Sequence, residues 1–341
     1  MQPLITVMRR HFGEEALIDL VCLERCQEAA LLLHGLNHVH TVQRGTGEIR
    51  EALQSREYHY LLDLHRHVRS RSLARDLKVL TLLVDKEVWA RWTLVQGWRK
   101  RPVKPFVERC FDVVKPFGIA APDVLPSKAD NPSESRHPGE SNPRGLWGPQ
   151  AWGRLHMAPS TSSDPTGHVV LSLGSSHPGK HLSDAVVDAV VQTCLESGRD
   201  IVLVGGPDAK ARSHRLQRQH PEVIDHVGTW TLAQTTRSIA DADAVISGDT
   251  VTMHLASAVG TPLGTVWGCT RPALGLAPWR PHPSSQQFFP RGDESRPCSK
   301  HGATCRHTRS NDPHHPQRCS QHVDPVQVAA WLRGLLNQTK P

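Results

Sequence analysis

The second half of the sequence repeats one arrangement: a short aliphatic run reaches a glycine and is followed by a stretch with helical periodicity. Because these runs are apolar throughout rather than alternating, they are typical of parallel strands that helices cover on both faces. The predicted strands are Val169–Leu173, Ile201–Val204, Ala244–Ser247 and Gly264–Trp267, and the predicted helices are Ser183–Glu196, Ala233–Ala240 and His254–Val259. The pattern predicts an α/β fold for this half.

The first half shows the same alternation less regularly. The predicted strands are Leu17–Leu23, Val39–Gln43 and Tyr60–Leu64, and the predicted helices are Leu4–Phe12, Gly47–Arg56 and a segment near Pro105–Val114. A parallel α/β domain usually opens with a strand, whereas this chain opens with a predicted helix. We therefore expect the N-terminal domain to lack its first strand.

Residues 121–167 separate the two halves. They contain eight Pro, five Gly and seven Ser, which favours a linker or surface insertion, although a loop-rich part of one domain is the alternative. Asp324 and Pro325 supply an N-cap and a first-turn proline that start a C-terminal helix. The predicted division is a domain over 1–120, a linker over 121–167, a second domain over 168–323, and a helix over 324–341 that packs back on the first domain.

The positive charge of the chain is concentrated in one segment. The net charge is +7, and the segment from His65 to Arg109 alone contains twelve Lys and Arg against four Asp and Glu. Such a segment favours an anionic partner, while a solvated basic face is the alternative. Because the segment lacks the aromatic-interleaved basic motifs of RNA-binding proteins, we predict no nucleic-acid partner.

Two further features bear on where the protein works. The sequence contains no run of about 18 apolar residues and no signal-peptide pattern at its start. Its eight cysteines do not suggest a secreted disulfide framework. We expect a cytoplasmic protein.

The residues that follow each strand of the second half are suited to binding a nucleotide. In doubly wound sheets ligands bind beyond the carboxyl ends of the strands. The loop after the first strand includes Ser175, Ser176 and Lys180, whose backbone N–H groups, hydroxyls and ammonium can hold phosphate, although the loop does not match a Walker A motif and a plain turn is the alternative.

Acidic and hydroxyl side chains follow the next strands. Asp208 can accept hydrogen bonds from ribose hydroxyls, or it can simply stabilise a helix N-terminus. Asp249, Thr250 and His254 lead into another helix, where an ordinary N-cap is the alternative. Polar groups at successive strand ends of one sheet are more informative together than separately.

The stretch from about Val169 to Trp279 resembles glycosyltransferase family 9, the bacterial ADP-heptose:lipopolysaccharide heptosyltransferases. The resemblance is carried by LGSSHPGK, IVLVGGPD, GTWTLAQTTRSIADADAVIS, DTVTMHLASAVGTP and VWGCT. In the first half, YLLDLHRHVRSRSLAR and VERCFDVVKPFGI look similar to the acceptor domain of the family. The resemblance implies a GT-B architecture, in which two Rossmann-like domains face a cleft and the C-terminal domain binds the nucleotide sugar.

The resemblance also implies an activity and a set of site residues. The family transfers heptose from ADP-heptose to the inner core of lipopolysaccharide, with inversion and with neither an essential metal nor a cofactor. The implied acceptor is thus an anionic lipid-linked glycan at the inner membrane surface, which suits the basic segment. In this sequence Lys180 would stabilise the leaving ADP. The implied donor-binding residues are Ser175, Ser176, Lys180, Asp208, Trp230, Thr231, Asp249, Thr250 and His254, and the implied acceptor-binding residues are Arg66, Arg69 and Arg71.

Two departures from the family pattern support a rival interpretation. In the family a Gly-Asp loop after the very first strand is expected to supply the general base, and this loop would precede the helix at Leu4–Phe12. We expect that Met1 lies downstream of the true start or that the chain is truncated, and the base is therefore unassigned. Val251 also replaces a glycine of the donor motif. The rival is a non-catalytic relative that binds nucleotide sugar or glycan.

Three late cysteines, Cys298, Cys305 and Cys319, lie in a region that also holds five histidines. Their spacings, Cys-x6-Cys and Cys-x13-Cys, are not those of zinc fingers. A flexible polar loop is the favoured interpretation, and a structural thiol or metal cluster is the alternative.

Overall fold

The computed structural model describes residues 1–119, 167–290, 296–303, 305 and 318–338. The chain divides into two compact units: unit 1 comprises Met1–Glu87 and Pro105–His156, and unit 2 comprises Val88–Lys104 and Met157–Pro341. The α/β class predicted from the sequence is confirmed, because every strand pair of both units is parallel. None of the described helices is both long and apolar enough to cross a membrane.

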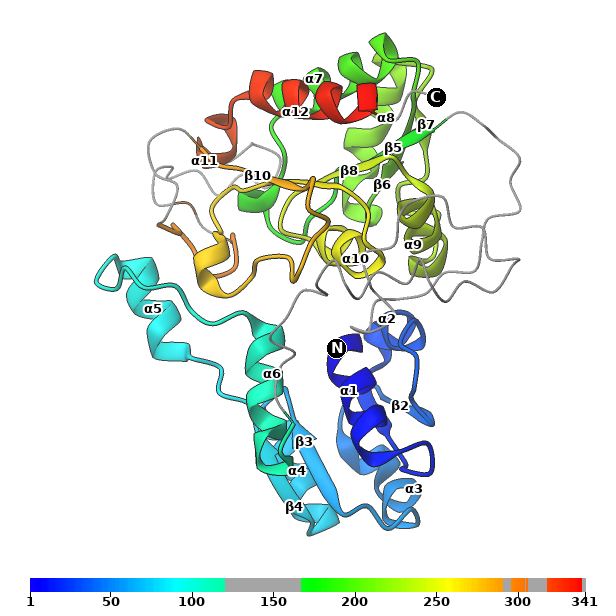
Figure 1. The fold of residues 1–341 in the computed structure, drawn as a ribbon, viewed down its shortest axis with the longest axis vertical. Coiled ribbons are helices and arrows are strands. Elements are labelled where there is room, and N and C mark those ends of the chain that lie inside the picture. Colours follow the sequence, from blue (N-terminus) through cyan, green and yellow to red (C-terminus); the bar gives the residue numbers. More distant parts are fainter. Residues whose placement is uncertain (120–166, 291–295, 304, 306–317, 339–341) are drawn as a thin grey trace, which may run out of the picture. The chain divides into compact units, whose positions relative to one another are not determined.

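Unit 2 is built on a six-stranded parallel sheet with the order β10-β9-β8-β5-β6-β7 (Figure 1). Its strands are β5 (His168–Ser172), β6 (Asp200–Val204), β7 (Ile224–Asp225), β8 (Ala244–Ser247), β9 (Leu263–Val266) and β10 (Gln286–Phe288). The central strands are almost completely buried, as their unbroken aliphatic sequences require.

The strand order places a topological switch point between β5 and β8. The helices of the unit are α5 (Val88–Gln96), α7 (Asp184–Glu196), α8 (Lys210–Gln219), α9 (Leu232–Asp241), α10 (Val251–Val259), α11 (Arg318–Gln321) and α12 (Pro325–Gln338). From β5 the chain proceeds outward to β6 and β7, then returns through α9 to β8 on the other side of β5. Since crossovers between parallel strands are right-handed, α7 and α8 cover one face of the sheet and α9 and α10 cover the other.

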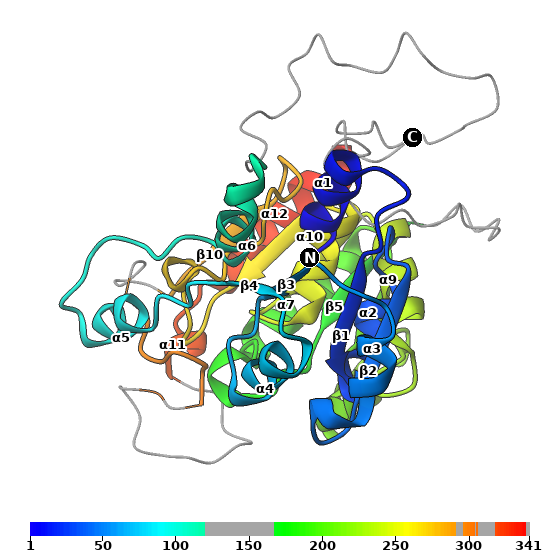
Figure 2. The ribbon, with the colours of Figure 1, turned by 90° about the horizontal axis from the view of Figure 1, so that it is seen from below.

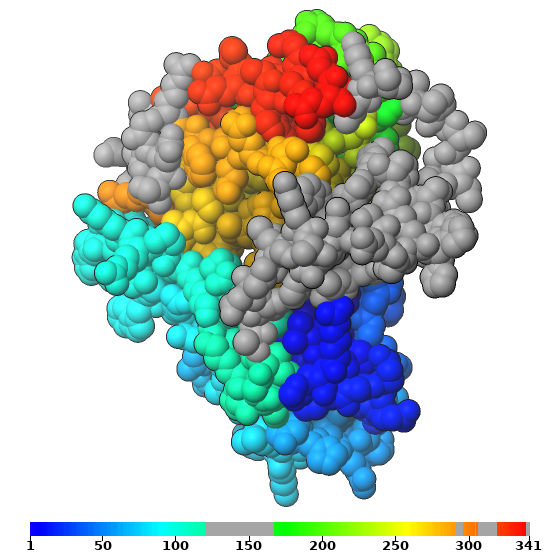
Figure 3. Space-filling view, in the orientation of Figure 1, coloured from blue at the N-terminus to red at the C-terminus, as the bar shows by residue number. Residues whose placement is uncertain are grey.

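Local sequence explains how α7 and α12 pack. Ser183 caps α7 by accepting a hydrogen bond from the Val186 N–H at 3.3 Å. The valines of α7 and the apolar residues of α12, including Val328 and Leu332, are buried in the main hydrophobic core together with β5 and β8. The sequence analysis expected α12 to pack on the first domain. The helix belongs to unit 2, where it contacts α7 and β10 and forms part of the outer surface (Figure 3). The apolar stripe of α12 does not indicate which surface will cover it, because that surface depends on the strand order of the sheet.

Unit 1 contains two separate two-stranded parallel sheets. One pairs β1 (Asp19–Leu23) with β2 (His38–Val42), which lie side by side in Figure 2, and the other pairs β3 (Tyr60–Asp63) with β4 (Leu80–Leu83). The helices are α1 (Gln2–Phe12), α2 (Gln27–Leu31), α3 (Arg50–Gln54), α4 (Val68–Leu77) and α6 (Phe106–Val114). The strands of these sheets are mostly half-buried, in contrast to those of unit 2.

The segment Val88–Lys104 differs from its predicted position in the first domain. Leu94 of α5 and Val103 are buried against Leu274, and the Val103 N–H donates a hydrogen bond to the Ala273 carbonyl at 2.8 Å. These contacts attach the segment to unit 2. Because α5 has apolar residues on most of its surface, sequence periodicity gave no indication of which unit it would join.

Candidate functional site

The carboxyl ends of the central strands approach one another closely in unit 2. A Cβ atom on Gly248, which follows β8, would lie 2.5 Å from the Lys180 carbonyl oxygen, and one on Gly205 would lie 3.0 Å from the Gly174 nitrogen. Gly268, just beyond β9, meets the Gly179 carbonyl oxygen in the same way. Glycine is required here because larger residues would separate the loops. The glycines noted in the sequence thus bring the strand-end loops together.

The centre of this edge is an ion pair between Lys180 and Asp249. Lys180 follows β5 and Asp249 follows β8, so the two residues flank the switch point of the sheet. The Lys180 Nζ lies 2.8 Å from the Asp249 Oδ2, and the two side chains are 18% and 5% exposed. A nearly buried carboxylate is tolerated because its counter-ion is adjacent, and the lysine is in turn held in one position. The ammonium retains further N–H donors for a ligand.

The N-terminus of α10 lies next to this pair. Thr250 occupies the N-cap position without making a side-chain capping bond, and its hydroxyl instead lies 2.9 Å from the Ser247 hydroxyl. The first N–H groups of a helix carry partial positive charge and favour anions. Val251 begins the helix with its side chain half exposed and is not among the residues with positive φ, so the position has no conformational need for glycine.

His254 lies one turn further along α10 and is exposed. The charges of both Asp249 and Lys180 act on its imidazole. Six residues after β5 and β8 are predicted to share a donor site. Of these, Lys180, Asp249 and Thr250 lie together in the loops, and His254 lies on the adjoining helix.

The two serines of the loop after β5 have different environments. The Ser175 hydroxyl donates to the His177 carbonyl at 3.3 Å, and the Ser175 carbonyl lies 3.0 Å from the His181 Nε2. Ser175 therefore shapes the loop, whereas Ser176 is exposed. Asp208 is also exposed, in the turn after β6, with its carboxylate close to Gly206.

Trp230 has a partner that the sequence analysis missed. Its ring stacks on the His226 imidazole with a centroid separation of 3.7 Å and an interplanar angle of 14°. Burial lowers the pKa of His226, which favours the neutral ring in this stack. Thr231 forms a capping box with Gln234: its hydroxyl accepts from the Gln234 N–H at 3.2 Å, and its own N–H donates to the Gln234 Oε1 at 2.9 Å.

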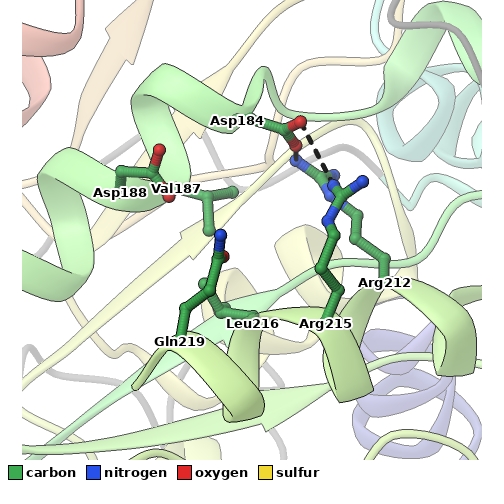
Figure 4. A pocket seen from close by; sticks show the side chains of 7 residues that line it. All are labelled: Asp184, Val187, Asp188, Arg212, Arg215, Leu216 and Gln219. Atoms are coloured by element: carbon green, nitrogen blue, oxygen red, sulfur yellow. Dashed lines mark hydrogen bonds and ion pairs between the residues drawn. The ribbon is translucent and has the colours of Figure 1, made fainter.

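A cavity of about 290 Å³ lies elsewhere in the unit, between α7 and α8 (Figure 4). Two arginines, Arg212 and Arg215, pair with Asp184 at its rim. That carboxylate pairs with both arginines, and the cavity includes none of the strand-end residues that the sequence predicts to bind the donor.

Comparison with known proteins identifies the family. Residues 46–304 match the sequence profile of glycosyltransferase family 9 (heptosyltransferase), which is more than half of the chain. The chain belongs to glycosyltransferase family 9. It is accordingly a glycosyltransferase enzyme, and the predicted family is confirmed. No curated protein sequence matches it.

Solved structures of this family share the fold of the glycosyltransferase. The chain is similar to Escherichia coli ADP-heptose LPS heptosyltransferase II. The two share 16% identity, the match covers 99% of this chain and 94% of that chain, and the TM-score is 0.65. A family 9 glycosyltransferase from Veillonella parvula gives 14% identity, coverage of 99% and 93%, and a TM-score of 0.69. E. coli heptosyltransferase WaaC with ADP gives 22% identity, coverage of 81% and 85%, and a TM-score of 0.58. The GT-B fold class is thereby confirmed.

The three arginines predicted to bind acceptor lie in unit 1 of the glycosyltransferase. Arg66 follows β3 and has a φ of 47°, in the left-handed region that glycine adopts most readily. The Asp63 carboxylate accepts the N–H of Arg66 at 2.6 Å and stabilises this turn. Arg69 and Arg71 lie on α4, and all three arginine side chains are exposed.

The glycosyltransferase also contains residues next to Lys180 that sequence reasoning missed. Gly302 accepts a hydrogen bond from the Gly179 N–H at 3.0 Å through its carbonyl, and it packs against the side-chain carbons of Lys180. Cys269 donates through its N–H to the Gly179 carbonyl at 2.6 Å. Cys269 stood in the recognised VWGCT stretch, but nothing in the sequence indicated that Gly302, far along the chain, would join it.

Proposed function

We propose that this enzyme transfers a heptose-type sugar, with inversion, from an ADP-sugar to an anionic lipopolysaccharide inner-core acceptor. The observation that carries the proposal is the Lys180–Asp249 pair beside the uncapped N-terminus of α10, at the switch point of the sheet. The similar WaaC structures contain ADP and ADP-2-deoxy-2-fluoro heptose, and this supports the same donor class here.

The reaction requires this edge of unit 2 to stabilise the leaving group. As the bond from the anomeric carbon to the diphosphate oxygen breaks, negative charge accumulates on the departing phosphate. Lys180 and the first N–H groups of α10 stabilise that charge because both are fixed before the reaction begins. Asp249 holds the lysine in position, and Ser176 and His254 line the approach of the phosphates and sugar.

The nucleoside is held by the adjoining loops in this proposal. Asp208, exposed after β6, accepts hydrogen bonds from the ribose hydroxyls. An adenine ring extends the stack that Trp230 already forms with His226. Fluorescence of Trp230 then changes on addition of ADP and much less on addition of UDP, and the response disappears in Trp230→Phe. Equal responses to both nucleotides would exclude an adenine-selective pocket.

The acceptor side of the proposal rests on charge. Exposed Arg66, Arg69 and Arg71 suit the carboxylates and phosphates of an inner-core glycan. On unit 2, α5 turns Leu94 inward while Trp89 and Trp98 are 77% and 74% exposed. Exposed Lys100 and Arg101 follow these tryptophans. Tryptophan beside basic residues is typical of proteins that contact anionic membranes, so α5 is the proposed contact with the inner membrane surface.

The transfer reaction itself is the direct test. With ADP-heptose and a Kdo-bearing lipid both present, the protein is expected to release ADP, and omission of either substrate abolishes the release. Isothermal titration calorimetry with ADP and UDP establishes the donor preference independently of turnover. Binding of ADP without turnover would favour the non-catalytic relative, and failure to bind ADP would overturn the donor site.

A further inference from the structure

Four cysteine thiols lie close together in unit 2, beside the strand-end loop that holds Lys180. The Sγ atoms of Cys269, Cys298, Cys305 and Cys319 all lie within 4.8 Å of one another. Cys269, Cys305 and Cys319 are buried and Cys298 is half-buried, and none of the four forms a disulfide in the structure. They form a cluster of their own, separate from the main hydrophobic core of the unit.

The four thiols come from distant parts of the chain. Cys269 follows β9, Cys298 and Cys305 lie in the segment after β10, and Cys319 lies on α11. The Cys298 N–H also donates to the Cys269 carbonyl at 2.9 Å, which anchors the late segment to the strand end. The sequence analysis found only three of the four, and their spacing failed to match a zinc finger because the fourth ligand precedes them by 29 residues.

The arrangement has the dimensions of a metal site. Zinc–sulfur bonds of about 2.3 Å in a tetrahedron place the sulfurs about 3.8 Å apart. The Sγ of Cys319 lies 3.1 Å from that of Cys298 and 3.8 Å from that of Cys305. A disulfide would join sulfurs in pairs, whereas here each of the four is a neighbour of the other three.

We propose that Cys269, Cys298, Cys305 and Cys319 bind one tetrahedrally coordinated metal ion of the kind that prefers four thiolates, with Zn²⁺ as the expected ion. Soft sulfur ligands in a tetrahedral S₄ set select zinc or iron over harder cations. All four positions are filled by protein, so the site is structural and has no open position for catalysis. The metal joins β9, the segment after β10 and α11.

The site also backs the loop that holds Lys180. Cys269 and Gly302 both hydrogen-bond to Gly179, the residue before Lys180, and Gly302 packs against the lysine side chain. The metal therefore fixes the position of the Lys180 ammonium, and loss of the metal loosens the loop that holds Lys180. This consequence rests on the proposed function, whereas the existence of the site does not.

Metal content of the full chain is the first test. Protein purified without chelators and with reductant is expected to contain about one zinc per chain by inductively coupled plasma mass spectrometry. Cys269→Ser and Cys319→Ser each abolish this stoichiometric zinc. Cys194→Ala is the matched buried control, since Cys194 is completely buried on α7 and burial raises its pKa to about 12. Cys26→Ser is the exposed control. Both controls retain the zinc.

A second measurement on the unaltered chain covers the case in which the serine variants fail to fold. Titration with a mercurial reagent is expected to release the zinc to a metallochromic dye as the cluster thiols react. Removal of the metal lowers the Tm by on the order of 10 °C, and added zinc restores it. Stoichiometric iron with thiolate-to-metal absorption bands supports the same S₄ site with the other ion. No metal after zinc supplementation, with the four thiols free or joined as disulfides, overturns the proposal.

Donor binding separates this proposal from the proposed function. Metal-free protein is expected to bind ADP at least tenfold more weakly than zinc-loaded protein, measured below the Tm of both forms. If the zinc is present but neither form binds ADP, the proposed function fails and the metal site stands. If both forms bind ADP equally, the link from the metal to Lys180 is wrong.

Discussion

The two units of this glycosyltransferase are built from the same kind of element but differ in how completely they bury it. Strands β5, β8 and β9 of unit 2 are buried almost throughout, and they belong to one six-stranded sheet. Strands β1, β3 and β4 of unit 1 are half-buried or exposed along most of their length and lie in two small sheets. The same alternation of strand and helix therefore yields two levels of rigidity.

The difference suits the two substrates of the proposed reaction. A transition-state charge is best stabilised by groups fixed in advance, and Lys180 and Asp249 are fixed by close backbone approach and by a buried ion pair. The exposed arginines of unit 1 have no such support and suit a large, polyanionic acceptor that needs charge rather than one exact geometry. Substitutions at the strand-end loops of unit 2 should therefore impair activity strongly, and substitutions of the unit 1 arginines should impair it less.

Amide hydrogen exchange is expected to show the largest contrast between the units. Amides of β5 and β8 should exchange about three orders of magnitude more slowly than those of β1 and β3, because the buried sheet opens only with global unfolding. Mass spectrometry of peptic peptides measures the difference. Equal protection in both units would remove the basis of the comparison.

The next largest effect is expected from the buried ion pair. Lys180→Ala should lower kcat by about 100-fold or more through lost stabilisation of the leaving group. It should also lower the free energy of unfolding by about 3 kcal/mol, because it leaves Asp249 buried without a partner. The double variant Lys180→Ala, Asp249→Ala should regain much of the stability and none of the activity. Steady-state kinetics and urea unfolding measure the two quantities.

A surface ion pair in unit 1 supplies the matched control. Lys115 Nζ lies 2.6 Å from Asp112 Oδ1, and the two side chains are 63% and 36% exposed. Lys115→Ala should change neither activity nor stability measurably, because solvent screens an exposed pair. If Lys180→Ala and Lys115→Ala had the same kcat and the same free energy of unfolding, the burial of Lys180 would not matter for activity or stability.

Charge removal at the three arginines on and just before α4 is expected to have a smaller and more selective effect. Replacing Arg66, Arg69 and Arg71 together by Gln should raise the KM for the anionic acceptor about tenfold and leave ADP affinity unchanged. The effect should shrink as ionic strength rises, because salt screens exposed charges. The control replaces three other exposed arginines of unit 1, Arg10, Arg25 and Arg44. A weaker donor affinity in the first variant would show that the arginines do not act on the acceptor.

The smallest effect is expected at Thr231. Its hydroxyl is engaged in the capping box with Gln234, so Thr231→Ala should cost about 1 kcal/mol, a Tm decrease of about 3 °C. Thr231→Ser should retain the cap and the stability. Affinity for ADP should be the same in both variants. A loss of affinity confined to the alanine variant would instead support the donor-binding role that the family resemblance implies.

Strands bounded by glycine were the part of the fold that the sequence predicted well. The predicted Ala244–Ser247 coincides with β8, and the predicted Val169–Leu173 is displaced from β5 by one residue. The helix α8 was missed because its sequence, KARSHRLQRQ, has no apolar stripe, and only Leu216 and Ser213 are buried. Strand β4 was missed because it directly follows α4 without a punctuating glycine or proline.

Some features of the candidate site could likewise be predicted from the sequence, and others could not. The proximity of Lys180 to Asp249 and Thr250 could be predicted because each lies in the loop that follows a recognisable strand, and strand ends of a parallel sheet meet at one edge. The His226–Trp230 stack could not be predicted, because it depends on side-chain rotation after a two-residue strand. The capping box at Thr231 was readable as T-x-x-Q, but the family resemblance drew attention to donor binding instead.

By itself, the sequence determined the α/β class, the family and the loops that carry the proposed donor-binding residues, because each depends on neighbours within a few residues. Only the tertiary structure decided that α5 and α12 belong to unit 2 and that Cys269 joins Cys298, Cys305 and Cys319. These outcomes depend on which strands become neighbours in the sheet. Burial of apolar faces selects that order across distances in the chain that local pattern does not encode.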